Sequence, residues 1–238
     1  MLKTKMFLII KDKSERVKNK NFRNIDNVPL HSYFMLNRKS FEIYIDTDSD
    51  RIIDEYSDKT KWPHVTVYSR LKKHIEMENS GNISPAPLLV ARFLDEYITD
   101  ENESIVTSHI TSPFLEDLSI NTALEKMKFF DSVSSIEEVK EFSVYGENGH
   151  EKPINFDNNK IVKTQSLKPV KVLNGAFFII KKKIFMNNGL KRISDNHLYF
   201  SLSKKESIDI DTEFDLSVAQ SIASKKFNKQ NGEKIESY

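Results

Sequence analysis

Residues 6–10 read Met6-Phe7-Leu8-Ile9-Ile10, and this short run of bulky apolar side chains predicts a buried β-strand. Such a run is far too short for a signal sequence or a membrane span, so we expect neither here. A basic segment follows at 11–23, and the first helical pattern comes after it at 30–36. The order strand, polar loop, helix is typical of the first half of a βαβ unit.

The same alternation of short apolar runs and helical patterns continues along the chain. It predicts an α/β, Rossmann-like fold in which a mainly parallel central sheet is flanked by helices. We expect the further strands at 41–45, 65–68, 104–108 and 176–180, and the helices at 30–36, 50–56, 87–98, 118–130 and 214–223.

A length of 238 residues fits one large α/β domain, which we place at 1–224. The stretch 132–172 reads differently, because it combines β-leaning pieces, polar connectors and the turn Glu147-Asn148-Gly149. We interpret this stretch as a small β-rich excursion from the main sheet. Residues 225–238 are mostly polar and offer little to bury, which predicts a disordered tail.

The composition is that of an ordinary globular protein, with 38% hydrophobic and 30% charged residues. Lys and Arg total 36 against 35 Asp and Glu, and the net charge of +1 gives no general attraction to nucleic acid. The chain has no cysteine, which excludes a disulfide framework and a thiolate metal site and suits a reducing compartment. We therefore expect a cytoplasmic protein that has neither a membrane nor a nucleic acid as its partner.

The basic segment after the first strand is a candidate phosphate-binding loop. Ligands of doubly wound sheets bind beyond the carboxyl ends of the strands. Six of the thirteen residues at 11–23 are basic, and Ser14, Asn19 and Asn21 add neutral hydrogen-bonding groups. Lysine charges and arginine forks of this kind can surround a triphosphate. Taken alone, a charged loop is more often simply solvated, and the missing GxxxxGK[ST] pattern excludes a P-loop ATPase.

Two other strand ends carry weaker signals. Residues 46–50 (DTDSD) are either an acidic metal loop or the start of the next helix, with Ser49 as its N-cap. His109 follows the strand at 104–108 and should face the ligand side of the sheet. A lone histidine is more often structural than a ligand, so His109 alone does not define a site.

Asp209 and Asp211 lie two residues apart in the segment 206–215. On an extended chain their carboxylates share one face, which makes them a good site for a hard cation such as Mg²⁺. In the alternative interpretation, Asp211 or Thr212 only caps the next helix, with Asp215 completing a variant capping box. A cap would not account for Asp209.

Five motifs resemble, in their order along the chain, those of the acylneuraminate cytidylyltransferases, the CMP-sialic acid synthetase family. The most specific is 207–215 (SIDIDTEFD), which resembles the signature S-I-D-I-D-T-x-x-D. Ser14 with Lys20-Asn21 resembles the serine and the K-N pair of the triphosphate loop. The others are the V-S-T-D strand end at 45–48, the T-S-P-[LF] turn at 111–114 and the N-G-A-[IF]-[YF]-I strand at 174–179. The resemblance covers residues 6 to 223 approximately.

The resemblance implies a nucleotide-sugar transferase fold and a nucleotidyltransferase that joins CTP to a nonulosonic, sialic-acid-like sugar with release of pyrophosphate. It also implies a homodimer, with 132–172 as the protruding dimerisation segment. The residues that it assigns to CTP are Lys11, Ser14, Arg16, Lys20 and Asn21 around the phosphates and Arg70 near the cytosine. It assigns His109, Asn174 and Gln165 to the sugar, Asp209 and Asp211 to Mg²⁺, and Asp209, Asp211 and Lys20 to catalysis.

The chain departs from the family pattern at several positions. Lys11 stands where arginine is usual, Asp12 and Lys13 replace glycines, His109 replaces a glutamine, and Ser166 replaces the aspartate of a Q-D-L element. Two alternatives therefore stay open. One is a cytidylyltransferase for another sugar acid or polyol, such as a 3-deoxy-octulosonate, and the other is a catalytically inactive relative that serves as a binding subunit. A nucleic-acid-binding protein is disfavoured by the near-neutral charge and by the lack of aromatic residues among the basic ones.

Overall fold

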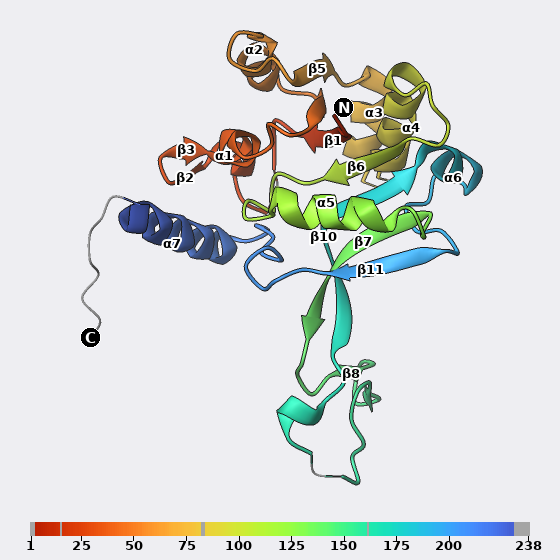
Figure 1. The fold of residues 1–238 in the computed structure, drawn as a ribbon. Helices are drawn as coiled ribbons and strands as arrows, with labels where there is room; N and C mark the ends of the chain where they lie inside the picture. Colours follow the sequence, from red (N-terminus) through yellow and green to blue (C-terminus); the bar gives the residue numbers. More distant parts are fainter. Residues whose placement is uncertain (1–2, 15, 82–83, 161, 231–238) are drawn as a thin grey trace.

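The computed structural model describes residues 3–14, 16–81, 84–160 and 162–230. Its centre is a seven-stranded sheet in the order β11-β7-β10-β6-β1-β4-β5 (Figure 1). All pairings in the sheet are parallel except those of β10, which runs antiparallel to both neighbours. The mainly parallel sheet expected from the sequence is thus confirmed. The strands are β1 (Lys5–Ile10), β4 (Glu42–Thr47), β5 (Val65–Ser69), β6 (Ser104–Ser108), β7 (Ser132–Val139), β10 (Val170–Lys181) and β11 (His197–Ser201).

Helices cover both faces of the sheet, because its central strands are apolar on both sides. In β1, Met6 and Leu8 pack on one face and Phe7 packs on the other. The first face is covered by α1 (Leu30–Leu36), α2 (Asp50–Ser57) and α5 (Asp117–Lys126). The second face is covered by α4 (Ala86–Tyr97) and α6 (Lys182–Asn187). None of the described helices is long and apolar enough to cross a membrane.

The last helix, α7 (Glu213–Gln230), packs beside α1 and closes a third apolar cluster. Leu216, Ala219 and Ala223 of α7 are buried there against Val17 of the basic loop and Leu30 of α1. Short elements link the loop to α1, namely η1 (Lys20–Phe22) and the pair β2 (Asn24–Ile25) and β3 (Val28–Pro29). The helix continues through Gln230, into the segment for which we expected disorder, and 231–238 lie outside the described residues.

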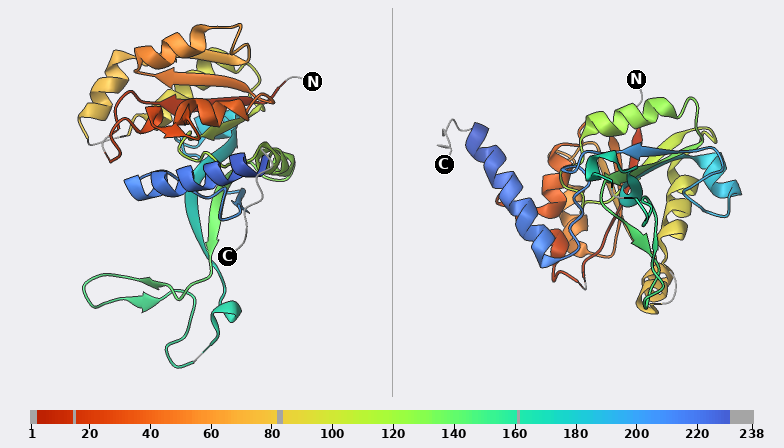
Figure 2. Two further views of the ribbon diagram at one scale, coloured as in Figure 1. Left: turned by 90° about the vertical axis from the view of Figure 1, so that its left-hand side faces the viewer. Right: turned by 90° about the horizontal axis from the view of Figure 1, so that it is seen from below.

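A β-arm projects from the body of the molecule, as Figures 1 and 2 show. Its stalk is the outer part of the β7–β10 pair, where Val170 pairs with Val139. Its far part carries β8 (Val144–Tyr145), β9 (Lys152–Pro153) and η2 (Thr164–Ser166). An excursion was expected here, but its predicted start at Ser132 is wrong, because Ser132 and Val133 are buried in the central sheet. Two of the buried β7 serines have hydrogen-bonded hydroxyls, since Ser132 contacts His197 and Ser194, and Ser135 donates to Asn174.

Candidate functional site

The basic loop after β1 is folded by its own side chains. The Ser14 hydroxyl accepts a hydrogen bond from the Lys20 backbone N–H at 2.8 Å. The Asn21 amide donates to the Lys11 carbonyl at 2.7 Å, and Val17 is fully buried under the loop. These contacts fix the loop in one shape, so that its cations lie along the rim of a pocket.

The pocket has a volume of about 650 Å³ and lies at the carboxyl ends of β1 and β6. Loop residues form one wall, and the segments after β6 and before α7 form a second. The start of α4 and the end of α3 (Lys72–Asn79) form a third. It is lined by Ile9, Lys11, Lys13, Ser14, Arg16, Val17, Lys20, Asn21, Glu78, Gly81, Ser84, Pro85, Ala86, Leu89, His109, Ile110, Thr111, Asp209 and Asp211.

Asp211 connects the segment before α7 to the basic loop after β1. Its carboxylate accepts from Arg16 Nη1 at 2.9 Å and from Lys20 Nζ at 3.3 Å. Lys20 also donates to the Ile210 carbonyl at 2.6 Å, and its side chain is only 13% exposed. The loop cations and the acidic segment are therefore in direct contact in the pocket, although 190 or more residues separate them in the sequence.

The helix cap that we considered as the alternative for this segment is also present. The Asp215 carboxylate accepts from the Thr212 N–H at 2.7 Å, and the Thr212 hydroxyl accepts from the Asp215 N–H at 3.2 Å. This reciprocal pair is a capping box at the start of α7. Asp209 takes no part in it. One Asp209 oxygen, Oδ1, is buried without a hydrogen-bond partner among the described residues, and burial raises the pKa of this carboxyl.

These two carboxylates fit a magnesium ion. Mg²⁺ in phosphoryl-transfer sites is usually held by one or two carboxylates together with substrate phosphates. Asp209 and Asp211 both line the pocket, and the unpartnered Asp209 oxygen is the kind of hard donor that such an ion prefers. Within the described ranges no group of three or more His, Cys, Asp or Glu side chains could hold a metal, so phosphate or water would have to complete the shell.

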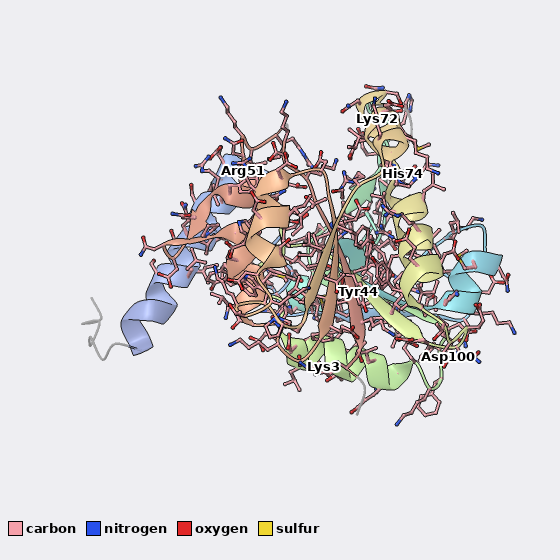
Figure 3. All side chains as sticks on the ribbon, turned by 90° about the horizontal axis from the view of Figure 1, so that it is seen from above. Lys3, Tyr44, Arg51, Lys72, His74 and Asp100 are labelled. Carbon is pink, nitrogen blue, oxygen red and sulfur yellow. The ribbon has the colours of Figure 1, made fainter. Side chains whose placement is uncertain are left out.

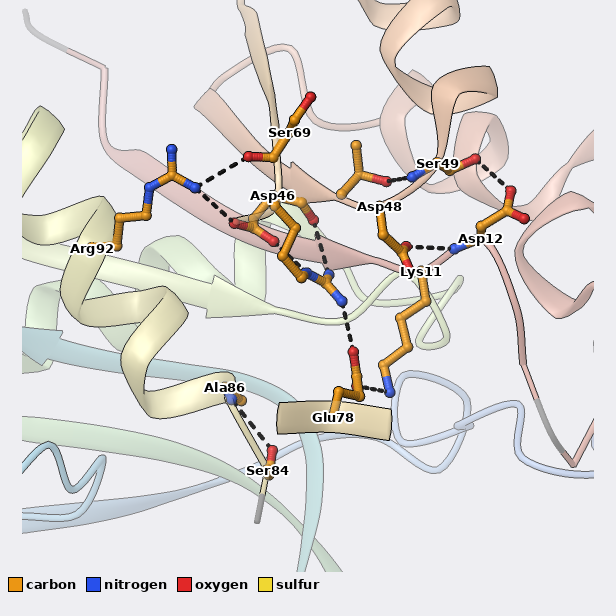
Figure 4. A network of polar contacts seen from close by, with 12 residues as sticks. Lys11, Asp12, Asp46, Asp48, Ser49, Ser69, Glu78, Ser84, Ala86 and Arg92 are labelled. Carbon is orange, nitrogen blue, oxygen red and sulfur yellow. Dashed lines mark hydrogen bonds and ion pairs between the residues drawn. The ribbon is translucent and has the colours of Figure 1, made fainter. Parts of the chain in front are cut away.

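A buried ion-pair network lies beside the pocket, at the carboxyl ends of β4 and β5 (Figure 4). Arg70 Nε donates to Asp46 at 2.6 Å, and both side chains are fully buried. Arg70 Nη1 donates to Glu78 at 2.8 Å, and Glu78 in turn pairs with Lys11. Arg70 thus holds a carboxylate at the pocket wall rather than lining the pocket itself. The expectation that Arg70 lies near a cytosine stays a prediction.

The other strand end, 46–50, behaves as a structural loop. Ser49 stands at the start of α2, but its hydroxyl donates to Asp12 at 2.7 Å and makes no cap. The Asp12 N–H donates to Asp48 at 2.8 Å. These contacts tie the acidic segment to the basic loop, and none of its residues lines the pocket.

His109 lines the pocket directly after β6 and is partly buried. Burial, together with the positive charges of Arg192 and Lys20 and against the opposing charge of Asp211, lowers its pKa from the ordinary 6.5 to about 4. The imidazole is therefore neutral at physiological pH. It can donate or accept a hydrogen bond but adds no charge to the pocket.

This lowered pKa predicts a loss of stability in acid. A histidine with a depressed folded pKa gives its full stability above pH 6.5 and loses it as the pH falls toward 4. Between pH 7 and pH 5, we expect the free energy of unfolding of the wild type to fall by about 1–2 kcal/mol more than that of His109→Gln. Urea unfolding at both pH values measures the difference. His150→Gln changes an exposed histidine of the arm, and its free energy of unfolding should fall by as much as that of the wild type between the two pH values. If the free energy of unfolding of His109→Gln fell by as much as that of the wild type, the lowered pKa of His109 would be contradicted.

Of the predicted site residues, eight line this pocket: Lys11, Ser14, Arg16, Lys20, Asn21, His109, Asp209 and Asp211. Arg70, Asn174 and Gln165 do not. The Asn174 amide is engaged with Ser135 at 2.7 Å and with Ser207 at 3.0 Å. Gln165 is exposed on η2 of the arm. Sequence reasoning missed Glu78, because no apolar pattern marked α3 and its partners are distant along the chain.

A second hollow of about 640 Å³ lies at the opposite, amino ends of the strands, around Lys3, Lys39 and His64. Figure 3 shows the two ends: Lys3 and Asp100 lie at one, and Arg51, Lys72 and His74 lie at the other. Ligands of open α/β sheets bind at the carboxyl ends. The pocket around Asp211 therefore remains the candidate site.

No family model matches the sequence, and no curated protein matches it. The fold, in contrast, is similar to that of several solved structures. One is a CMP-2-keto-3-deoxy-manno-octonic acid synthetase complexed with CTP, at 9% identity and a TM-score of 0.63, covering 94% of this chain and 100% of that chain. A second is a 4-diphosphocytidyl-2C-methyl-D-erythritol synthase from Anaerococcus prevotii, at 10% identity and a TM-score of 0.59, covering 93% and 96%.

A third similar structure is a molybdopterin-guanine dinucleotide biosynthesis protein A from Archaeoglobus fulgidus, at 13% identity and a TM-score of 0.56. It covers 93% of this chain and 100% of that chain. At such low identity these likenesses establish a Rossmann-like α/β fold and leave the reaction to be argued from the site.

Proposed function

We propose that the chain is a CTP-dependent cytidylyltransferase that joins CTP to a sugar acid and releases pyrophosphate. One observation carries the proposal, namely the contact of Lys20 and Arg16 with Asp211 inside a pocket at the carboxyl ends of the sheet. A loop of cations suits a triphosphate, and two acidic side chains suit its magnesium ion. The motif at 207–215 favours a nonulosonic acid as the acceptor. The fold likeness to an octonic acid synthetase supports an octulosonate as the second candidate.

In the proposed reaction, the acceptor's hydroxyl oxygen attacks the α-phosphorus of CTP. A new O–P bond forms, the bond from the α-phosphorus to the bridging oxygen breaks, and pyrophosphate leaves with that electron pair. The hydroxyl proton passes to a carboxylate of the pocket or to water. Positioning and charge stabilisation drive phosphoryl transfer of this kind. Lys20, Arg16 and Lys11 would therefore bind and neutralise the phosphates, and Mg²⁺ held by Asp209 and Asp211 would supply further positive charge.

The first test is pyrophosphate release in the presence of CTP and Mg²⁺. The acceptors form a panel of acids of the neuraminate, legionaminate, pseudaminate and octulosonate types. Release with one acid, abolished by a chelator, would support both the reaction and that acceptor. If no acid of the panel gave pyrophosphate release and the chain also did not bind CTP, the proposal would be contradicted and an inactive relative would be favoured.

Lys20→Ala should weaken CTP binding roughly ten- to 100-fold while changing binding of the acid less than threefold, because its ammonium, which contacts Asp211 in the pocket, is proposed to bind the phosphates. Isothermal titration of each ligand measures both effects. Lys18→Ala, at an exposed position in the same loop, is the matched control and should leave both affinities unchanged. Equal losses for CTP and acid in Lys20→Ala would contradict the phosphate role.

We further propose that the chain is a homodimer that uses its arm. Monomers rarely expose large contiguous apolar patches. The arm presents Val144, Tyr145 and Ile154, which are 55%, 80% and 52% exposed. Light scattering should give twice the chain mass of 27.7 kDa. The cytoplasmic location inferred from the cysteine-free sequence stays a prediction.

A further inference from the structure

Arg192 is a partly buried cation in the loop between α6 and β11. Its guanidinium carbon lies 4.8 Å from the centre of the Phe178 ring. Burial lowers the pKa of this guanidinium, and no carboxylate of the described chain offsets the effect. Burying a charge without a paired group is costly, so an arginine in this position indicates a missing anionic partner.

The position of Phe178 places Arg192 next to the candidate site. Phe178 of β10 pairs across the sheet with Thr107 of β6, and His109 follows the end of β6. His109 lines the pocket, and Arg192 is close enough for its charge to act on the imidazole. Arg192 does not line the pocket, but it stacks on the residue opposite Thr107, two positions before His109, and so lies on the part of the sheet that leads to the His109 side of the pocket.

Two hydroxyl side chains without hydrogen-bond partners lie on the strands next to Phe178. Phe178 pairs with Thr107 on one side and with Ser134 of β7 on the other. The side-chain oxygens of Thr107 and Ser134 are buried and have no hydrogen-bond partner among the described residues. Buried hydroxyls are normally paired. This part of the sheet thus combines a cation with two unused hydroxyl groups, which favours a polar, anionic ligand.

We propose that Arg192 binds the carboxylate of the acceptor, on the Phe178 face of the pocket beside His109. The inference rests on the proposed function, since it names the group that holds the second substrate. Packing on an aromatic ring leaves the N–H edge of a guanidinium available, and that edge matches a carboxylate through two parallel hydrogen bonds. An uncharged polyol would leave the cation unpaired. The subsite therefore selects acids over neutral sugars.

The test compares the same panel of acids with their uncharged methyl esters, by titration into the full chain without nucleotide. The wild type should bind at least one acid roughly ten- to 100-fold more tightly than its ester. In Arg192→Gln this preference should disappear, whereas Lys191→Gln, an exposed cation in the same loop, should keep it. Arg192→Lys should retain part of the preference, because it keeps the charge and loses the fork.

Two results would overturn the inference. One is a wild type that binds no acid of the panel more tightly than its ester. The other is an Arg192→Gln variant that keeps the wild-type preference, with its fold verified by circular dichroism. Titration of CTP is a separate arm. A wild type that selects acids but does not bind CTP would refute the cytidylyltransferase and leave the Arg192 assignment standing.

Discussion

Asp211→Ala will lower turnover by on the order of 1000-fold while the chain stays folded. Asp211 contacts both Lys20 and Arg16 and shares the pocket with Asp209. Under the proposed function, its removal would take away a magnesium ligand and free two cations that would position the phosphates. Its side chain is 35% exposed, which keeps the structural cost of the change small. The measurement is pyrophosphate release at saturating CTP and acid, beside a thermal unfolding curve.

Glu213→Ala provides the matched control. Glu213 lies two residues further along and pairs with Arg23 at 3.1 Å, in an exposed ion pair outside the pocket. Its loss removes a carboxylate of the same segment without touching the site, so turnover should stay within about twofold, as expected for an exposed pair worth less than about 1 kcal/mol. An active, well-folded Asp211→Ala enzyme would refute the assignment of this carboxylate to metal and phosphate.

Arg70→Leu will lower the free energy of unfolding by about 3–5 kcal/mol. Arg70 and Asp46 are both fully buried, and their contact of 2.6 Å is the main charge compensation that Asp46 receives. Burial raises the pKa of Asp46, and Arg70 opposes that rise. Without Arg70, Asp46 must either stay charged in an apolar surrounding or take up a proton, and both outcomes destabilise the fold at neutral pH. Chemical denaturation at pH 7 measures the loss.

Two further variants test the cause. Arg51→Leu removes an exposed partner of Asp12 and should cost less than about 1 kcal/mol. Asp46→Asn, introduced into Arg70→Leu, removes a buried charge that then has only the more distant Arg92 at 3.7 Å, and it should restore part of the lost stability. If Arg70→Leu cost no more than Arg51→Leu, the buried pair would contribute nothing beyond an exposed one.

The elements with long apolar runs could be predicted closely from the sequence. The helix at 30–36 and the strand at 104–108 coincide with α1 and β6, and the other predicted elements overlap α2, α4, α5, α7, β1, β4, β5 and β10. The two strands at one end of the sheet, β7 and β11, were not among the predicted strands of the sheet. β7 begins Ser132-Val133-Ser134-Ser135, and its serines are buried only because neighbouring strands satisfy or enclose them. α3 has charged residues on most of its turns, and tertiary ion pairs hold it in place.

The candidate site also contains some residues that could be predicted from the sequence and others that could not. Lys20 and Asp211 could be predicted because each lies in a local motif that follows a strand or precedes a helix. Arg70 was expected in the site, yet its guanidinium is taken by Asp46 and Glu78. Arg192 carried no local signal, since its importance depends on the aromatic ring beneath it and on the scarcity of carboxylates around it. Such properties arise only when distant segments meet.

The pocket places counter-charges beside its own cations. Lys11, Lys13, Arg16 and Lys20 share it with Glu78, Asp209 and Asp211, so four positive groups stand among three negative ones. The field of such a mixed surface fades within about one Debye length, roughly 8 Å at physiological salt. An anion arriving from bulk solution will therefore be guided little by long-range steering, and its encounter rate will change little with ionic strength. Selection takes place at contact, where lysines exchange their carboxylate partners for the oxygens of the ligand.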